Sequence, residues 1–269
     1  MSLNTTVLPA ASQTQTITPH PPIIAHRGVP GAARENTLAS FEEAWRQEAD
    51  GVETDIHLTR DQRIVCHHDS GIPRAFWGKL AIAKSSYKTA RRAFGKGRRP
   101  GEHLPLLNEV LEALPPGKSL YIEIKCGLEI VPVLKTVLEE SPVSLEQVTV
   151  ICFNPGVIGA WKEAMPNVKA LWLSSYLREE YPPYQACTPP ALVKKVRTAG
   201  ADGVSIESQE SLDKTLTQYL RKQGMEVHVW TVDSTHQAIW YRDLGLDSIT
   251  TNRPGEIRRY FSRAKAPHQ

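Results

Sequence analysis

The stretch GVETDIHLTRDQRIVCHH, residues 51–68, determines how the rest of the chain is interpreted. Two strand-like runs, GVETDIHL (51–58) and IVCHH (64–68), are separated only by TRDQR (59–63). A connection between parallel strands needs about a dozen residues or more, so this pair must be antiparallel. The second run is therefore predicted as a hairpin strand that returns beside the first.

Without that return strand, eight strand-like runs remain, and helix-like stretches follow them. The runs are PIIAH (22–26), GVETDIHL (51–58), SLYIEIK (119–125), VTVICF (148–153), VKALWL (168–173), DGVSIE (202–207), EVHVWTV (226–232) and DSITT (247–251). This alternation predicts an α/β fold, a TIM (β/α)8 barrel with an extra hairpin strand. The alternative is an open, doubly wound parallel sheet. We expect one catalytic domain over residues 21–269 and a flexible tail over residues 1–20.

The composition is that of a globular protein, with 41% hydrophobic and 23% charged residues. These values exclude disordered and fibrous classes, and no apolar run approaches the ~20 residues that span a bilayer. The N-terminal segment has neither the basic nor the apolar region of a signal peptide. The four cysteines show no CxxC spacing and are predicted to be reduced thiols, so we expect a cytoplasmic protein.

Residues 72–103 are predicted to form a small basic insertion after the hairpin. They contain nine lysines and arginines and one acid, Glu102, whereas the formal net charge of the whole chain is only +3. One interpretation is a solvated basic helix. The other is a basic cap that attracts an anionic substrate or makes a peripheral contact with a membrane. The modest overall charge gives no argument for a nucleic-acid partner, and none is expected.

Acidic side chains are expected to gather at the carboxyl ends of the strands, which is where barrel enzymes have their active sites. Because strand side chains alternate, Glu53 and Asp55 point the same way from one strand, and Glu123 and Lys125 point the same way from another strand. Three carboxylates at one barrel mouth would repel one another, and oxygen ligands favour a hard divalent cation, Mg²⁺ or Ca²⁺. The alternative is a structural network in which Lys125 and Arg27 neutralise the acids.

Histidines are predicted at the same end of the barrel. His26 and Arg27 end the first strand, and the hairpin brings His67 and His68, of which strand alternation would turn only one toward the mouth. Two imidazoles and an arginine beside a cation suit phosphoryl chemistry, with one histidine as acid and the other as base. Each histidine could equally be a hydrogen-bonded structural residue, and His57 is a weaker candidate.

Three other features at the predicted mouth have less certain roles. Trp230 is expected either to form a wall of the pocket or to pack in the core. Glu207 is a weak candidate for reaching the mouth. The loop 174–189, rich in proline and tyrosine, is a candidate for substrate selection.

A series of short motifs resembles the glycerophosphodiester phosphodiesterase family. They are HRG (26–28), ENTLASF (35–41), GVETDIHLT (51–59), HD (68–69), LPLLNEVL (104–111), EIK (123–125), VWTVD (229–233) and TNRP (251–254). Each motif is short, but their order and spacing over residues 23–258 are specific. Arg34, Cys152 and Asp233 depart from the usual pattern.

The resemblance implies a TIM-like barrel with residues 72–103 as its insertion. It implies metal ligands at Glu53, Asp55 and Glu123, catalytic histidines at His26 and His68, and substrate contacts from Arg27, Lys125 and Trp230. The implied reaction is metal-dependent hydrolysis of a glycerophosphodiester to an alcohol and sn-glycerol 3-phosphate.

Two alternatives to this reaction remain. One is a lysophospholipase D-type enzyme that acts on lipids at a membrane surface. The other is a barrel that binds a phosphodiester without cleaving it. The sequence leaves open the head group, the choice between Mg²⁺ and Ca²⁺, the roles of the two histidines, the nucleophile and the oligomeric state.

Overall fold

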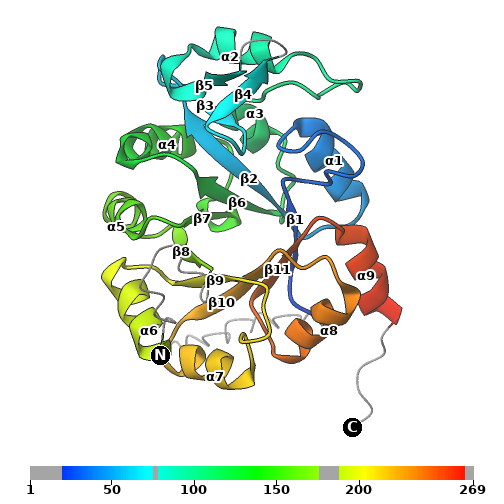
Figure 1. Cartoon of the computed structure of the whole chain (residues 1–269), viewed down its shortest axis with the longest axis vertical. Coiled ribbons are helices and arrows are strands. Elements are labelled where there is room, and N and C mark those ends of the chain that lie inside the picture. Colours follow the sequence, from blue (N-terminus) through cyan, green and yellow to red (C-terminus); the bar gives the residue numbers. More distant parts are fainter. Residues whose placement is uncertain (1–19, 75–77, 176–187, 264–269) are drawn as a thin grey trace, which may run out of the picture.

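The computed structural model describes residues 20–74, 78–175 and 188–263 (Figure 1). A nine-stranded sheet forms its centre, and all of its strands except β3 run parallel. The parallel strands are β1 (Ile23–His26), β2 (Gly51–Leu58), β6 (Ser119–Ile124), β7 (Val148–Cys152), β8 (Lys169–Ser174), β9 (Gly203–Glu207), β10 (Glu226–Trp230) and β11 (Ser248–Thr251). Because β1 pairs with both β2 and β11, the sheet closes into a barrel. The predicted TIM barrel is confirmed, and the open-sheet alternative is wrong.

Helices surround the barrel and connect successive strands, as Figure 1 shows. They are α1 (Leu38–Arg46), α3 (Leu107–Glu112), α4 (Val131–Glu139), α5 (Pro155–Ala164), α6 (Pro189–Thr198), α7 (Lys214–Lys222), α8 (Thr235–Asp243) and α9 (Pro254–Arg263). Capping side chains start several of them: Thr37 accepts a hydrogen bond at the start of α1, and Asn154 does so at the start of α5. Short 3₁₀ turns occupy η2 (Leu128–Ile130) and η3 (Leu145–Gln147). No helix in the described ranges is both long and apolar enough to cross a bilayer.

The predicted hairpin strand is β3 (Ile64–Cys66), and it pairs antiparallel with the end of β2. The prediction extended this strand to His68, two residues too far. Beyond Cys66 the His67 N–H still donates to the Asp55 carbonyl oxygen of β2 at 2.9 Å, and on the other edge of β3 the Cys66 N–H donates to the Pro105 carbonyl oxygen at 3.0 Å. The Val65–Leu106 bridge lies beside this bond, so the chain leaves the barrel and returns to it at neighbouring points.

The insertion contains more regular structure than the predicted basic helix. Strands β4 (Gly71–Arg74) and β5 (Gly78–Ala81) form an antiparallel pair that the sequence analysis missed. The one-turn η1 (Ile82–Lys84) and the basic helix α2 (Tyr87–Phe94) follow. Its buried apolar side chains Ile72, Ile82, Ala90 and Phe94 pack in one cluster with Val65 of β3 and with Leu104. The insertion therefore has a small core beside the barrel.

The three cysteines that the structure describes are free thiols. Cys66 and Cys152 are buried free thiols and Cys126 is a half-buried one, as expected. Cys187 and the segment before His20 lie outside the described residues.

Candidate active site

The centre of the site is a group of three carboxylates on two adjacent strands. Glu53 and Asp55 occupy alternate positions of β2, and Asp55 stands in register with Glu123 on β6. One carboxylate oxygen from each of the three residues lies within 4.8 Å of the others. All three side chains are buried at the carboxyl end of the barrel. The alternation of side chains on β2 therefore produces the predicted cluster.

The cluster has the properties of an oxygen-ligand cation site. Glu53 Oε1 and Asp55 Oδ1 are buried and have no hydrogen-bond partner. Burial, together with the charges of Asp55 and Glu123, raises the pKa of Glu53 well above its usual value. Burial and the charge of Asp55 likewise raise the pKa of Glu123 to about 7. Asp55 Oδ1 lies 3.6 Å from Lys125 Nζ without a hydrogen bond. A hard divalent cation would coordinate Glu53 Oε1 and Asp55 Oδ1 and remove the repulsion, so these residues fit such an ion.

Arg27 and Lys125 lie against the same carboxylates. Arg27 Nε is 3.1 Å from Asp55 Oδ2, and Lys125 Nζ is 2.8 Å from Glu123 Oε1. Burial works to raise the pKa of Asp55, but the two cations outweigh it and lower that pKa. The alternative in which Arg27 and Lys125 neutralise the carboxylates is therefore partly realised. Two cations still balance only two of the three carboxylates, and the pKa values of Glu53 and Glu123 are both raised.

The turn after β1 positions Arg27. Both Arg27 (φ 56°) and Gly28 (φ 82°) have left-handed backbone conformations. A Cβ on Gly28 would lie only 2.6 Å from the backbone of Ser40, so only glycine fits there. The turn points the Arg27 N–H at Glu53 Oε2, at 3.0 Å.

His26 borders the cluster and has a defined tautomer. Its Nε2 lies 3.9 Å from Glu53 Oε2, and its Nδ1 lies 2.9 Å from Asn252 Oδ1. The Asn252 amide nitrogen donates to Asp233 Oδ2 at 2.7 Å, which turns the amide oxygen toward His26. His26 Nδ1 must therefore carry the proton, leaving Nε2 as the free acceptor. Burial, then the charge of Arg27, lowers the pKa of His26.

His68 has a different environment, at the boundary with the insertion. Its Nδ1 donates to Asp69 Oδ1 at 2.9 Å, and Lys79 Nζ donates to Asp69 Oδ2 at 2.6 Å. Hydrogen bonds from Lys79 and His68 lower the pKa of Asp69 to about 2. His57 Nε2 donates to the His68 carbonyl oxygen at 3.1 Å, so His57 helps to hold the backbone at His68 in place.

His67 and His68 both line one cavity of about 210 Å³. None of the three clustered carboxylates lines this cavity, so which of the two histidines faces the mouth stays a prediction. The His67 ring contacts Phe94 edge-on, and its Nδ1 donates to the Asp69 carbonyl oxygen.

Two asparagines of this site had no role that residue type predicted. Asn36 donates from its amide to Asp55 Oδ2 at 2.8 Å and accepts from the Asp55 N–H at 3.0 Å. Asn252 orients His26. The ENT and TNRP motifs marked both positions, but residue type and spacing alone did not indicate what the amides contact.

The remaining candidates lie on the far side of the barrel mouth. Trp230 is half-buried; its Nε1 donates to the Ser205 carbonyl oxygen, and its ring contacts Phe153 edge-on at 5.6 Å between centroids. Phe153 is 42% exposed. Glu207 stands in register with Trp230 and is half-buried. Most of the loop 174–189 lies outside the described residues.

Comparisons with known proteins agree with this geometry. Residues 26–256 match the model of the glycerophosphoryl diester phosphodiesterase family. A glycerophosphodiester phosphodiesterase from Bacillus altitudinis is 28% identical over 86% of this chain and 94% of its own. A human lysophospholipase D is 24% identical over 90% of this chain and 87% of its own.

Solved structures share the fold. An Oleispira antarctica phosphodiesterase in complex with the product sn-glycerol-3-phosphate has a TM-score of 0.75 and 23% identity, covering 90% of this chain and 97% of that one. A Thermotoga maritima glycerophosphodiester phosphodiesterase has a TM-score of 0.72 and 21% identity, covering 89% of this chain and 98% of that one.

Proposed function

The chain belongs to the glycerophosphoryl diester phosphodiesterase family, and on that premise we propose that it hydrolyses glycerophosphodiesters to an alcohol and sn-glycerol 3-phosphate. The observation that carries the proposal is the group of three buried carboxylates within 4.8 Å, with two oxygens that accept no hydrogen bond, beside His26. Phosphodiester binding alone requires neither this cation site nor an oriented imidazole.

In this proposal Glu53, Asp55 and Glu123 hold a divalent cation, Mg²⁺ or Ca²⁺. When bound, the cation supplies positive charge that polarises the phosphoryl group and lowers the pKa of a nearby hydroxyl. The three carboxylates fix its position because β2 and β6 hold them in register.

Arg27 and Lys125 are the proposed phosphate contacts. Each already lies against a carboxylate of the cluster, so each is held near the place where a phosphate would bind. Their charges would stabilise the oxygens that become more negative as the P–O bond breaks. Groups of this kind typically contribute a few kcal/mol to transition-state stabilisation.

His26 is proposed as the general base and His68 as the general acid. The hydrogen bond to Asn252 leaves His26 Nε2 free to take a proton, and burial keeps the ring neutral. His68, held by the Asp69 carboxylate, would give a proton to the departing alcohol oxygen. The nucleophile is either water or the substrate's own 2-hydroxyl, which would give a cyclic phosphate first.

Trp230, with Phe153 beside it, is the proposed wall for the organic part of the substrate. Both residues present aromatic surface near the carboxyl ends of their strands. A glycerol or alcohol carbon chain would pack against such a surface while the charged residues bind the phosphate.

The direct test is turnover of glycerophosphocholine, followed by the appearance of sn-glycerol 3-phosphate. We expect turnover with Mg²⁺ or Ca²⁺ and loss of turnover with EDTA, restored by excess cation. H26A and H68A should each lower kcat by about 100-fold or more. Full activity in EDTA would contradict the cation site, and absence of turnover across a panel of diesters would contradict the reaction.

A second candidate is lysophospholipase D activity, and the human relative with that name favours it. The same assay with lysophosphatidylcholine distinguishes the two. If the lysolipid is the better substrate by kcat/KM, the second candidate is correct.

A further inference from the structure

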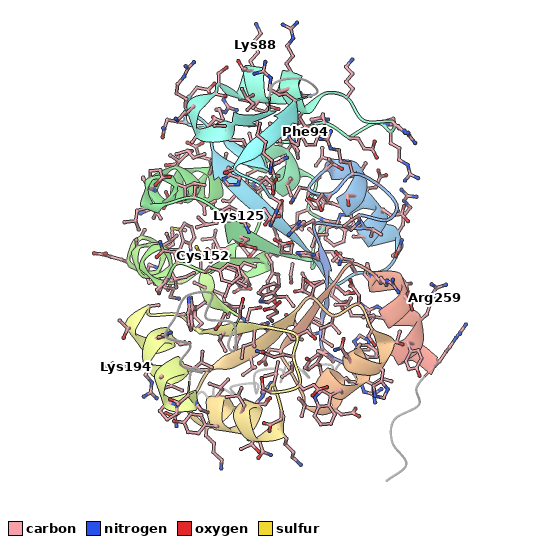
Figure 2. All side chains as sticks on the ribbon, viewed as in Figure 1. Lys88, Phe94, Lys125, Cys152, Lys194 and Arg259 are labelled. Atoms are coloured by element: carbon pink, nitrogen blue, oxygen red, sulfur yellow. The ribbon has the colours of Figure 1, made fainter. Side chains whose placement is uncertain are left out.

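The insertion has a surface charge unlike that of the barrel. Its segment 78–101 contains no acidic residue, and it includes Lys79, Lys84, Lys88, Arg91, Arg92, Lys96, Arg98 and Arg99. All eight side chains are exposed. In Figure 2 Lys88 extends from the outer edge of the insertion, whereas Phe94 lies on the side that faces the barrel.

Six of these cations surround one cavity. It has a volume of about 760 Å³ and lies between α2 and the loop 95–103. Helix α2 contributes Lys88, Arg91 and Arg92, and the loop contributes Lys96, Arg98 and Arg99. Like charges on both walls repel one another across the cavity, so an anion between them would stabilise the arrangement.

The one acid of the cavity does not neutralise these side chains. The Glu102 carboxylate instead accepts backbone N–H groups from Arg34, Arg98 and Arg99, at 3.2, 2.7 and 3.1 Å. Glu102 therefore holds the loop in shape. Among the described residues, none of the six cations forms an ion pair with an acid; Arg91 instead donates to the Tyr87 hydroxyl.

The chemistry of this surface favours a phosphate-bearing ligand. Arginine forks and lysine ammonium groups are the common partners of phosphate oxygens. The cavity volume lies within the range of about 300–1,000 Å³ that small-ligand sites occupy. The large hydrophobic side chains that the described residues expose are Leu128, Phe153, Trp240 and Tyr260, none of them in the insertion. Tyr87, the tyrosine that lines the cavity, is half-buried and its hydroxyl accepts from Arg91, so the cavity offers no row of exposed rings on which unpaired nucleic-acid bases would stack.

We propose that this cavity binds the phosphate headgroup of an anionic lipid, and that the insertion thereby docks the protein on a membrane. Membrane docking accounts for the exposed cations outside the cavity, Arg74 and Lys84, which extend the positive surface beyond a single ligand site. The docked insertion lies next to the proposed acid, because Phe94, at the end of α2, and His68 line the same small cavity. This inference does not depend on the proposed reaction.

The test is co-sedimentation of the full chain with phosphatidylcholine vesicles. One set contains phosphatidic acid, whose headgroup is a phosphate monoester, and one contains phosphatidylglycerol at the same surface charge. We expect binding to both, tighter to phosphatidic acid, and weakening as salt rises. No binding to pure phosphatidylcholine is expected.

Matched double variants separate the cavity from overall charge. K88Q/R98Q removes one cation from each wall, and K194Q/R259Q removes one lysine and one arginine from exposed positions far from Lys88 in Figure 2. The cavity variant should lose about tenfold or more in vesicle affinity, since each basic residue near an anionic surface contributes about 1 kcal/mol. The control should bind like the wild type.

Three outcomes would overturn the proposal. They are equal losses in the two variants, no binding to anionic vesicles, or no binding to the vesicles under conditions in which the free protein binds inorganic phosphate. The last would indicate a site for a soluble anion. Turnover of glycerophosphocholine should be unchanged in both variants, so a failure of the proposed reaction would be recognised separately.

Discussion

Asn252 Oδ1 accepts a hydrogen bond from His26 Nδ1 at 2.9 Å, although 226 residues separate them. The two side chains meet because β1 and β11 are neighbours where the barrel closes. Asp233 fixes the direction of the amide, so a carboxylate that does not touch His26 determines which of its nitrogens is free. The order of the strands thus fixes the protonation pattern of the proposed base.

Replacing Asn252 should impair this base without removing it. In N252A the Nδ1 proton loses its acceptor and the other tautomer becomes accessible, so kcat should fall about 10- to 100-fold. The measurement is kcat and KM for glycerophosphocholine across pH. N167A, at an exposed turn position, should change neither. If instead KM rises and kcat stays unchanged, Asn252 acts in substrate binding.

The Lys79–Asp69–His68 chain should matter for the proposed acid. D69N keeps an acceptor for His68 but removes its charge, and should lower kcat by about tenfold or more. K79M should lower kcat only a few-fold, because Asp69 remains. K84M, an exposed lysine of the insertion, is the matched control. If D69N leaves both kcat and its pH profile unchanged, Asp69 has no role in the reaction.

Binding of a divalent cation at the carboxylate cluster should raise the stability of the folded protein. A ligand at about 100 times its Kd stabilises the folded state by about 3 kcal/mol. Mg²⁺ or Ca²⁺ should therefore raise the thermal unfolding midpoint of the wild type by several degrees and that of E53Q very little. E163Q, exposed on α5, should respond like the wild type. An equal rise in E53Q would place the bound cation elsewhere.

Glu226 should contribute stability that is lost in acid. Burial works to raise the pKa of Glu226, but hydrogen bonds from His228 and Lys169 outweigh it and lower that pKa to about 2. The contribution is present above the unfolded pKa near 4.3 and disappears as pH falls toward 2. With solvent screening allowed for, E226Q should cost about 1–2 kcal/mol at neutral pH.

Urea unfolding of the wild type and E226Q measures this difference. The two curves should converge between about pH 4.5 and 2. A difference that stays constant through that range would mean that the glutamate stabilises by packing and not by charge.

The barrel was predictable because its signals are local. Hydrophobic runs of strand length alternate with capped helices, and the short connection 59–63 allows only an antiparallel return. The hairpin β4–β5 was missed for a related reason. GIPR and GKLA contain glycine and proline and few β-branched residues, and their pairing depends on the small core formed with Phe94 and Leu104.

The candidate site was partly predictable. The period of two on β2 placed Glu53 and Asp55 on one face, and parallel strands brought Glu123 beside them. Amide side chains carry no such signal, because Asn36 and Asn252 act through contacts 19 and 226 residues away in the chain. The positions of His67 and His68 also depend on where β3 stops, next to the hydrogen bond from Cys66 to Pro105, and no local pattern in the sequence marks that point.

That bond has a consequence for how the enzyme can diversify. The segment between Cys66 and Pro105 begins and ends at two residues that are hydrogen-bonded to each other. A segment of another length can therefore replace it while β2 and β6 stay in place. The carboxylates belong to the permanent frame, but His68, Asp69 and Lys79 belong to the replaceable piece. With His68 as the proposed acid and the insertion as the proposed membrane contact, swapping this piece between relatives would exchange surface preference and proton donor together.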